Sequence, residues 1–246
     1  MVMSVDYNKL ANWYQKYRKP DPRIANKIWC HTNQAEKVLN IGAGTGAYEP
    51  ESCEVVAIEP SSEMVAMRKN SSAKILHGIA ENLPFRDNEF DVSMAILTIH
   101  HWSDIQIGLS EMSRVTRKKI VLLTWVGYES GFWLEDYLPE IKDIDLNLFP
   151  SLVNLESILG SISVETVDIP HDCTDGFMCA YWRRPSAYLN PEIRKAISTF
   201  SRISDTDRNL IKLQDDLESG VWKEKYGYLL QKLSLDLGYR LVIHEQ

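Results

Sequence analysis

The sequence has few cysteines, no long apolar run and no excess of basic residues. Its 246 residues include only four cysteines, none in a CxxC pair and none at zinc-binding spacing from the six histidines. We therefore expect reduced, mostly buried thiols and no metal site. No stretch approaches the roughly 18 apolar residues that a membrane helix needs, and the N-terminal segment has no apolar export signal. These absences predict a cytoplasmic protein without a membrane partner.

Acidic residues outnumber basic ones. The chain has 34 Asp and Glu against 27 Lys and Arg, which gives a formal net charge of −7. An acidic chain has no general attraction for phosphate backbones, so nucleic acid is not an expected partner. With 44% hydrophobic residues the chain can form a packed core. Its length fits one large domain, or one domain with a sizeable insert.

The first half of the chain alternates short apolar runs with segments of helical spacing. This alternation indicates βαβ units and a parallel sheet. Because the apolar runs are nearly continuous, we expect both faces of the sheet to be covered. Strands are expected at 37–41, 54–58, 74–77, 90–98 and 119–125, and helices at 6–18, 23–31, 61–69 and 103–115.

The second half changes rhythm. Strands are expected at 164–169 and 239–244, separated by about 65 residues that read as helical. Such a connection is too long for a hairpin loop, so it predicts an inserted helical subdomain. Helices are expected at 191–204, 205–219 and 221–233.

A glycine turn follows the first expected strand. Residues 40–46 read NIGAGTG, and glycines let a backbone approach a ligand closely. The carboxyl ends of the first strands are where open α/β sheets bind ligands. Glu59 ends the second strand, where its carboxylate can accept hydrogen bonds from both hydroxyls of a ribose. Turn and acid together predict an adenosine cofactor.

The same turn also satisfies the dinucleotide pattern GxGxxG/A through Gly42, Gly44 and Ala47. That mode of binding needs a helix that opens after the turn and receives the pyrophosphate. Pro50 disfavours helical geometry at Glu49, and only about ten residues separate the turn from the second strand. We therefore expect a cofactor without phosphates.

Four segments, 38–46, 56–64, 78–85 and 90–102, resemble the motifs of class I S-adenosylmethionine (SAM)-dependent methyltransferases. They resemble in particular the broad small-molecule group (methyltransferase type 11) that includes quinone-biosynthesis enzymes. The second half, with HDCTDGF and AYWRRPSAYL, is similar to a bacterial subgroup of unknown substrate. The resemblance implies an α/β fold: a doubly wound, Rossmann-like, seven-stranded, mostly parallel sheet with a helical insert between the last two strands. The expected domains are a SAM-binding part at 1–170 plus 237–246 and a helical cap at 171–236.

The resemblance also implies site residues. Tyr14 and Arg18 match an N-terminal helix that closes over the cofactor in this family. We expect His100 or His101 to contact the acceptor, because both directly follow the fourth strand. The hypothesis is that one of them is the general base of catalysis. Cofactor contacts are expected from Tyr14, Arg18, Asn40, Gly42, Ala43, Gly44, Glu59, Pro60, Met64, Ala80, Glu81 and Leu97, and substrate contacts from Trp102, Asp172, Asp175, Tyr181, Trp182 and Arg183.

Three departures from the family pattern stand out. The family usually has an acid near the ammonium group of the cofactor where Asn40 stands. It often has an aspartate on the adenine amine where Ile79 stands, and Glu81 or backbone groups are the expected substitutes. The helix after the glycine turn is truncated.

Alternatives of other classes stay open at this point. The chain could bind SAM as a regulatory or interaction module without turnover. A nucleic-acid methyltransferase is opposed by the acidic balance and by the lack of an NPPY-like tetrad after the fourth strand. Met64 could equally be a core residue of its helix. Aromatic residues such as Tyr181 and Trp182 more often belong to a core than to a pocket. The acceptor and the oligomeric state are not defined by the sequence.

Overall fold

The computed structural model describes residues 14–68, 71–128 and 131–246. The chain divides into two compact units, which we call the sheet unit and the helical unit. The sheet unit comprises Pro22–Val126, Leu148–Val167 and Tyr239–Gln246, and the helical unit comprises Met1–Asp21, Gly127–Asn147 and Asp168–Gly238. The helical unit therefore contains the expected insert together with two segments from earlier in the chain.

The sheet unit is built on a seven-stranded sheet with the order β3-β2-β1-β4-β5-β9-β6. Neighbouring strands from β3 to β5 pair in parallel, and β9 is antiparallel to both β5 and β6. The predicted seven-stranded, mostly parallel fold is confirmed. The strands are β1 (Lys37–Ile41), β2 (Glu54–Glu59), β3 (Lys74–His77), β4 (Phe90–Ile96), β5 (Thr116–Trp125), β6 (Ser163–Thr166) and β9 (Tyr239–Glu245).

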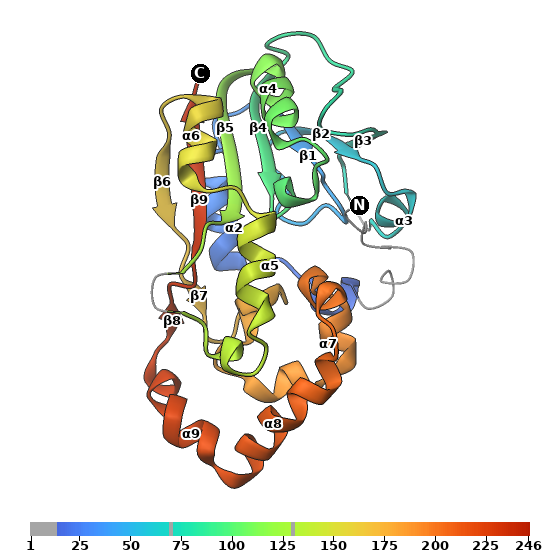
Figure 1. The fold of residues 1–246 in the computed structure, drawn as a ribbon. Coiled ribbons are helices and arrows are strands. Elements are labelled where there is room, and N and C mark those ends of the chain that lie inside the picture. The colour runs from blue at the N-terminus through green and yellow to red at the C-terminus, as the bar shows by residue number, and fades with distance from the viewer. Residues whose placement is uncertain (1–13, 69–70, 129–130) are drawn as a thin grey trace. The chain divides into compact units, whose positions relative to one another are not determined.

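Helices cover both faces of this sheet. Figure 1 shows α4 (Ile105–Val115) and α6 (Leu152–Leu159) on one face and α2 (Pro22–Trp29) behind the other. Alternate residues of each strand point to opposite faces, so strands that are apolar on both faces require cover on both. The core beneath α4 and α6 contains Leu39, Ile41, Val56, Ile58, Ala95, Leu109, Met112, Ile120, Leu122, Leu155 and Val242.

A buried carboxylate fastens the amino ends of the central strands. The Asp91 side chain in β4 is only 2% exposed. It accepts hydrogen bonds from the backbone N–H groups of Glu36 and Lys37, where β1 begins, at 2.9 and 3.2 Å. Lys118 and Arg117 on β5 donate to the same carboxylate and hold its pKa well below the usual range. Asp91 thus links three strands at the edge of the sheet away from the glycine turn.

The expected strand at 164–169 is wrong in one respect, because the chain leaves the large sheet partway along it. β6 ends at Thr166, and Ile169–Pro170 forms β7, which pairs with β8 (Ser234–Leu235) in a separate two-stranded sheet. Pro170 is itself paired with Ser234 in this small sheet, and the His171 N–H donates to the Leu233 carbonyl at 2.9 Å.

The helical unit consists of short helices around an aromatic core. The Trp133 ring lies 5.4 Å from that of Trp222 and 5.7 Å from that of Tyr188. Two of the expected helices are interrupted: Ile197 is extended inside 191–204, and Tyr226 leaves helical geometry inside 221–233. The elements are η2 (Trp133–Asp136), α5 (Glu140–Leu148), η3 (Met178–Tyr181), η4 (Pro185–Leu189), α7 (Pro191–Lys195), η5 (Ser198–Arg202), α8 (Thr206–Ser219), α9 (Val221–Tyr226) and η6 (Gly227–Gln231).

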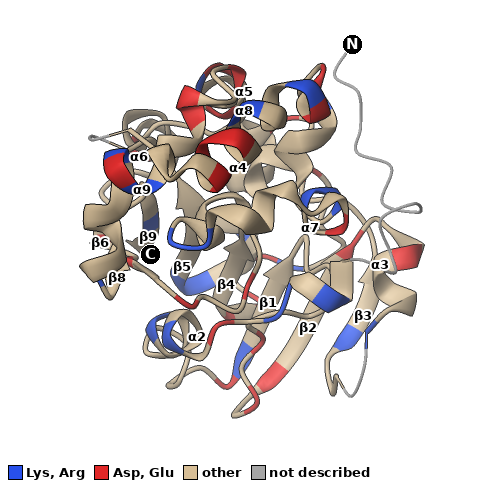
Figure 2. Cartoon of the chain, turned by 90° about the horizontal axis from the view of Figure 1, so that it is seen from below, with Lys and Arg blue, Asp and Glu red and all other residues tan. Residues whose placement is uncertain are grey.

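Charged residues of both signs share the same helices. Figure 2 colours acidic and basic residues interspersed along the ribbon, and α4 and α8 each contain residues of both signs, as on an ordinary solvated surface. Within the described residues, no helix has the length and apolar character needed to cross a membrane. The four cysteines are unbonded, and only Cys173 and Cys179 are buried, so the expectation of mostly buried thiols holds for half of them.

Candidate cofactor site

The glycine turn lies at the carboxyl end of β1 and is fastened to β2. The N–H groups of Gly42 and Ala43 both donate to the Ile58 carbonyl, at 2.9 and 3.0 Å. Gly42, Gly44 and Gly46 have φ values of +65°, +52° and +84°. This left-handed region is costly for residues with a Cβ, so the repeated glycines are what allow the turn to form.

The first two glycines have different surroundings. A Cβ on Gly42 would lie 2.1 Å from Oγ1 of Thr98, so the close approach of the chain after β4 requires a glycine there. A Cβ on Gly44 would meet no heavy atom within 4 Å. Gly42 is thus explained by packing inside the protein, whereas Gly44 leaves the turn accessible to a ligand.

Glu59 lies at the carboxyl end of β2, beside this turn. Its side chain accepts a hydrogen bond from the Gly44 N–H at 2.7 Å and another from the Ser61 N–H at 2.9 Å. The residue is only 6% exposed, and burial raises the pKa of its carboxyl group in spite of these hydrogen bonds. A buried carboxylate with two backbone donors is held in one orientation.

No helix follows the glycine turn, as the position of Pro50 predicts. Residues 42–53, all of which the structure describes, form turns and bends. Tyr48 is buried with φ of +66°, and its carbonyl accepts a hydrogen bond from Nε1 of Trp29 at 3.0 Å. A left-handed residue fixed in this way prevents helical continuation, so the N–H array that receives a pyrophosphate is not formed by this segment.

The other expected cofactor residues of the sheet unit lie on the same edge of the sheet. Asn40 is buried at the end of β1, and Met64 is buried in α3 (Ser62–Ala66). Ala80 is buried after β3, whereas Pro60 is exposed after β2. Leu97 follows β4 with φ of +52°.

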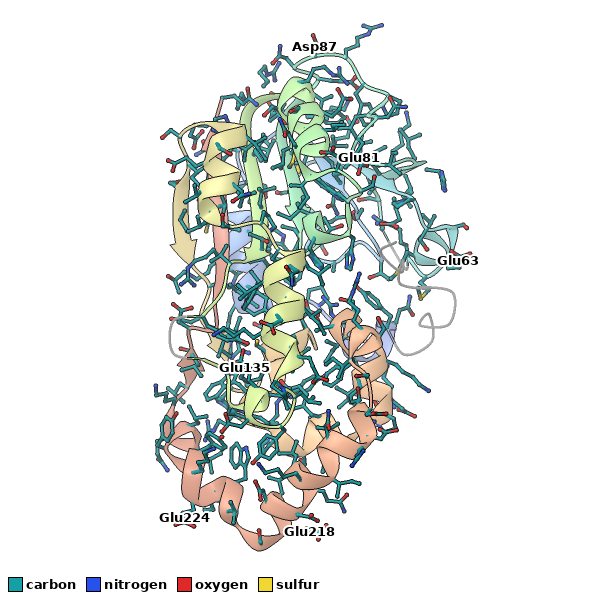
Figure 3. The ribbon with its side chains drawn as sticks, in the orientation of Figure 1. Glu63, Glu81, Asp87, Glu135, Glu218 and Glu224 are labelled. Carbon is teal, nitrogen blue, oxygen red and sulfur yellow. The ribbon has the colours of Figure 1, made fainter. Side chains whose placement is uncertain are left out.

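Glu81 holds the start of α4. Its Oε1 accepts hydrogen bonds from Ser103 N–H and Oγ–H at 2.7 and 2.8 Å and from Asp104 N–H at 3.0 Å. Burial alone would raise the pKa of Glu81, but these hydrogen bonds lower it. Figure 3 shows Glu81 beside α4 and Glu63 on α3. Glu81 therefore has a structural task in addition to the cofactor contact expected of it.

The two candidate histidines lie in a short 3₁₀ helix, η1 (Ile99–His101), just after β4. The half-buried His100 ring stacks on Phe149, with centroids 4.0 Å apart, and lies 3.9 Å from the His101 ring. His101 is exposed. Trp102 packs against Gly108, where a Cβ would be 2.5 Å from the indole ring. The stacking fixes His100, and the packing ties Trp102 to α4.

In the helical unit the structure brings together Tyr14, Arg18 and Asp175. The Arg18 Nε donates to Asp175 Oδ1 at 2.6 Å, and the Asp175 side chain is 3% exposed. The Arg18 guanidinium lies 5.1 Å from the centre of the Tyr14 ring. An ion pair therefore joins Arg18, expected at the cofactor, to Asp175, expected at the substrate, and the Tyr14 ring packs on the same guanidinium.

The remaining residues expected at the substrate differ in how deeply they are buried. Trp182 is fully buried, donates from Nε1 to the Ile169 carbonyl at 3.0 Å and accepts from Trp133 Nε1 at 2.7 Å. Tyr181 is buried under the Arg184 guanidinium. Asp172 is exposed, and Arg183 donates to the Lys232 carbonyl at 3.2 Å. Trp182 packs as a core residue of this unit.

Sequence reasoning missed Glu49, Arg68 and Thr98. The Arg68 and Glu49 side chains form an ion pair, 3% and 9% exposed, next to the glycine turn. Thr98 lies against Gly42. The sequence does show that Glu49 precedes the helix-breaking Pro50. It does not show that the Glu49 carboxylate pairs with the Arg68 guanidinium, because that contact exists only in the folded structure.

Comparisons with known proteins agree on a class. The family model described as "Methyltransferase domain" matches residues 39–123. A solved structure from Anabaena variabilis ATCC 29413, described as a candidate methyltransferase from an antibiotic biosynthesis pathway, is 33% identical, with a TM-score of 0.87. The match covers 93% of this chain and 99% of that one. The fold and these matches define a methyltransferase of the Rossmann-like class.

Two curated relatives match a shorter stretch. The uncharacterized methyltransferase YcgJ of Bacillus subtilis is 31% identical over 33% of this chain and 37% of its own length. A demethylmenaquinone methyltransferase of Beutenbergia cavernae is 33% identical over 46% of this chain and 53% of its own length. The chain thus spans about half or less of these curated relatives. Taken with the Anabaena structure, which is matched over nearly its whole length, the chain belongs to the class I SAM-dependent methyltransferase family.

Proposed function

We propose that this chain binds SAM at the glycine turn and transfers its methyl group to an O, N or C atom of a small-molecule acceptor. The observation that carries the proposal is the placement of Glu59 against Gly44 at the carboxyl ends of two adjacent parallel strands. Binding of adenosine needs a hydrogen-bond acceptor for the ribose hydroxyls and a stretch of backbone that the ligand can approach closely. A buried carboxylate and a turn that is open at Gly44 fit both needs.

The lack of a helix after the turn supports a cofactor without a pyrophosphate. In the proposed complex Glu59 accepts from the ribose hydroxyls, and the glycine turn contacts the rest of the cofactor. Met64 and Ala80, which are buried on the same edge, would contact the adenine. Gly42 packs on Thr98 inside the protein, whereas the space beside Gly44 is open. A side chain at position 44 would therefore exclude the cofactor.

The bound cofactor supplies a methyl group activated by a sulfonium, which an acceptor attacks by SN2 displacement. The residues of the chain hold the reacting groups in line and exclude water. A proton must leave a hydroxyl or amine acceptor around the time of attack. Of the two histidines after β4, His101 is exposed and able to take that proton, whereas His100 is held by its stacking on Phe149.

The acceptor class does not follow from the curated relatives. The relative named for demethylmenaquinone matches less than half of this chain, so we carry over the methyl transfer and not that acceptor. We propose that the helical unit, and within it residues 171–236, recognises the acceptor. Asp172, Asp175 and Arg183 would supply its polar contacts.

Calorimetric titration with SAM, S-adenosylhomocysteine and NAD tests the cofactor assignment. We expect both sulfur compounds to bind and NAD to bind poorly. Glu59→Ala should weaken SAM binding by about 1.5–3 kcal/mol, as for a lost hydrogen bond to a charged group. Glu54→Ala, an exposed carboxylate at the other end of β2, is the matched control and should bind normally. Tight NAD binding without SAM binding would end the methyltransferase assignment.

The histidine assignment is tested once an acceptor is known. His101→Ala should lower kcat and remove the acidic limb of the pH–rate profile between about pH 6 and 9, with SAM binding intact. His100→Ala, which removes the ring stacked on Phe149, separates loss of packing from loss of a base. If both variants keep wild-type rates over this range, neither histidine takes the proton.

A further inference from the structure

A buried carboxylate in the helical unit takes no part in the mechanism proposed above. Asp145 lies on α5 and is only 5% exposed. Its Oδ1 accepts a hydrogen bond from the Thr199 hydroxyl on η5 at 2.9 Å, and Thr199 is equally buried. Within the described parts of the chain, no other hydrogen bond and no ion pair reaches the Asp145 carboxylate. A single neutral hydroxyl is therefore its hydrogen-bond partner.

Three other buried acids of the chain are better satisfied. Asp91 accepts from two backbone N–H groups and pairs with two cations. Asp175 pairs with Arg18, and Glu59 accepts from two backbone N–H groups. An ionised carboxylate can accept about four hydrogen bonds, and burying its charge without matching donors costs free energy. Asp145 thus has capacity for further donors that the fold leaves unused.

The charged groups that face Asp145 do not compensate for its burial. The Glu135 carboxylate on η2, labelled in Figure 3, raises the pKa of Asp145, and the Arg202 guanidinium on η5 lowers it. Burial has the largest effect and raises this pKa to about 7. Two acids and one guanidinium have a formal charge of −1 when all three are ionised. One further positive charge would balance them.

The neighbouring guanidinium is not the donor that Asp145 lacks. Arg202 forms no ion pair with either acid in the part of the chain that the structure describes, and its Nε is buried there without a hydrogen-bond partner. Glu135 accepts from the Tyr128 hydroxyl, whose pKa is raised far above its usual value by burial and by the nearby acids. Tyr128 is therefore a neutral donor and brings no positive charge.

We propose that Asp145 binds the amino group of the acceptor, so that the acceptor is a small molecule with a basic amine. The inference rests on the proposed function and deepens it. An ammonium group brings N–H donors and one positive charge, and hydrogen bonds between ionised partners are the stronger kind. These properties match a buried carboxylate that has one neutral partner and a surrounding charge of −1.

Fractionation of acceptors tests the proposal on the wild-type chain. A small-molecule extract of the cells that make this protein is passed in dilute acid over a strong cation exchanger, which retains compounds with a basic amine. After neutralisation, labelled methyl groups should pass from SAM to the retained fraction, and acylation of its amines should abolish the transfer. Transfer confined to the unretained fraction, or unaffected by acylation, would overturn the proposal. If the unfractionated extract also supports no transfer, the proposed function itself fails.

Asp145→Asn connects the amine to this residue. With the acceptor purified from the retained fraction, the variant should raise KM by about tenfold to a hundredfold, the range for a hydrogen bond to a charged group. SAM binding, measured by calorimetry, should stay unchanged. Asp143→Asn is the matched control, because it removes an exposed acid from the same helix. An Asp145→Asn variant with the wild-type KM would overturn the proposal.

Urea unfolding separates binding from a structural role. Because the pKa of Asp145 is raised in the folded chain, its contribution to stability falls as the pH rises from about 4 to about 7. Asparagine removes this cost, so Asp145→Asn should be at least as stable as the wild type at neutral pH. If Asp145→Asn instead loses more stability than Asp143→Asn, the carboxylate holds the fold together and the proposal is overturned.

Discussion

At the scale of single residues, two glycines of the turn have different roles: Gly42 is needed for packing, and we propose that Gly44 is needed for ligand binding. Gly42→Ala should destabilise the chain more than Gly44→Ala, although both residues have positive φ. The left-handed backbone costs each variant about 1–2 kcal/mol, and only the Cβ at position 42 also collides with Thr98. That collision should add about 1–3 kcal/mol. Urea unfolding measures the difference.

Thr98→Ala provides the control for this comparison. It removes the hydroxyl and methyl that a Cβ at position 42 would meet, so the double variant should recover part of the stability lost by Gly42→Ala. Equal stability of the two glycine variants, or no recovery in the double variant, would contradict the explanation. SAM binding should respond differently: Gly44→Val should weaken it, because its side chain extends into the open side of the turn.

At the scale of elements, Asp91 fastens β1, β4 and β5 together, and this has a pH dependence. Hydrogen bonds from Lys118 and Arg117 lower its pKa in the folded chain. The carboxylate therefore adds stability above its unfolded pKa of about 3.9, and this stability is lost as the pH falls below that value. Asp91→Asn should cost about 1.5–3 kcal/mol near neutral pH and should flatten the acid limb of the stability curve.

Asp87→Asn is the matched control for Asp91. Asp87, labelled in Figure 3, pairs with Arg114, but its side chain is 72% exposed, and exposed ion pairs contribute little. Urea unfolding between about pH 2 and 7 compares the two. An Asp91→Asn variant with the acid sensitivity of the wild type would show that other groups govern unfolding in acid.

The elements also show what can be predicted from sequence. The limits of β1 and β3 were predictable because each is a short apolar run between clear turn signals. The end of β4 was placed too late, since Leu97 adopts a left-handed conformation that an apolar pattern does not reveal. The packing of the Tyr226 ring on that of Trp133 and the Glu49–Arg68 ion pair both depend on tertiary contact. Local pattern contains neither.

At the scale of the whole molecule, we propose that the cofactor binds to the sheet unit and the acceptor to the helical unit, so the two binding events can be measured separately. Hydrogen–deuterium exchange with SAM should slow in the sheet unit around 42–46 and 58–64, because ligand binding stabilises the segments it contacts. Residues 171–236 should change little until an acceptor analogue is added. Protection confined to 171–236 with SAM alone would place the cofactor in the helical unit.

The position of β9 between β5 and β6 has a consequence for biosynthesis. Both neighbours are translated long before it, since β5 ends at Trp125 and β6 at Thr166, whereas β9 begins at Tyr239. Until that strand has left the ribosome, β5 has one unpaired edge and β6 has no partner in the sheet, and exposed edges are prone to pair with other chains. The nascent chain therefore makes the whole of the segment 168–238 before its large sheet can close. A premature stop codon anywhere in that segment would release a polypeptide in which β5 and β6 both lack their shared partner, and such a polypeptide is a natural substrate for chaperones and proteases.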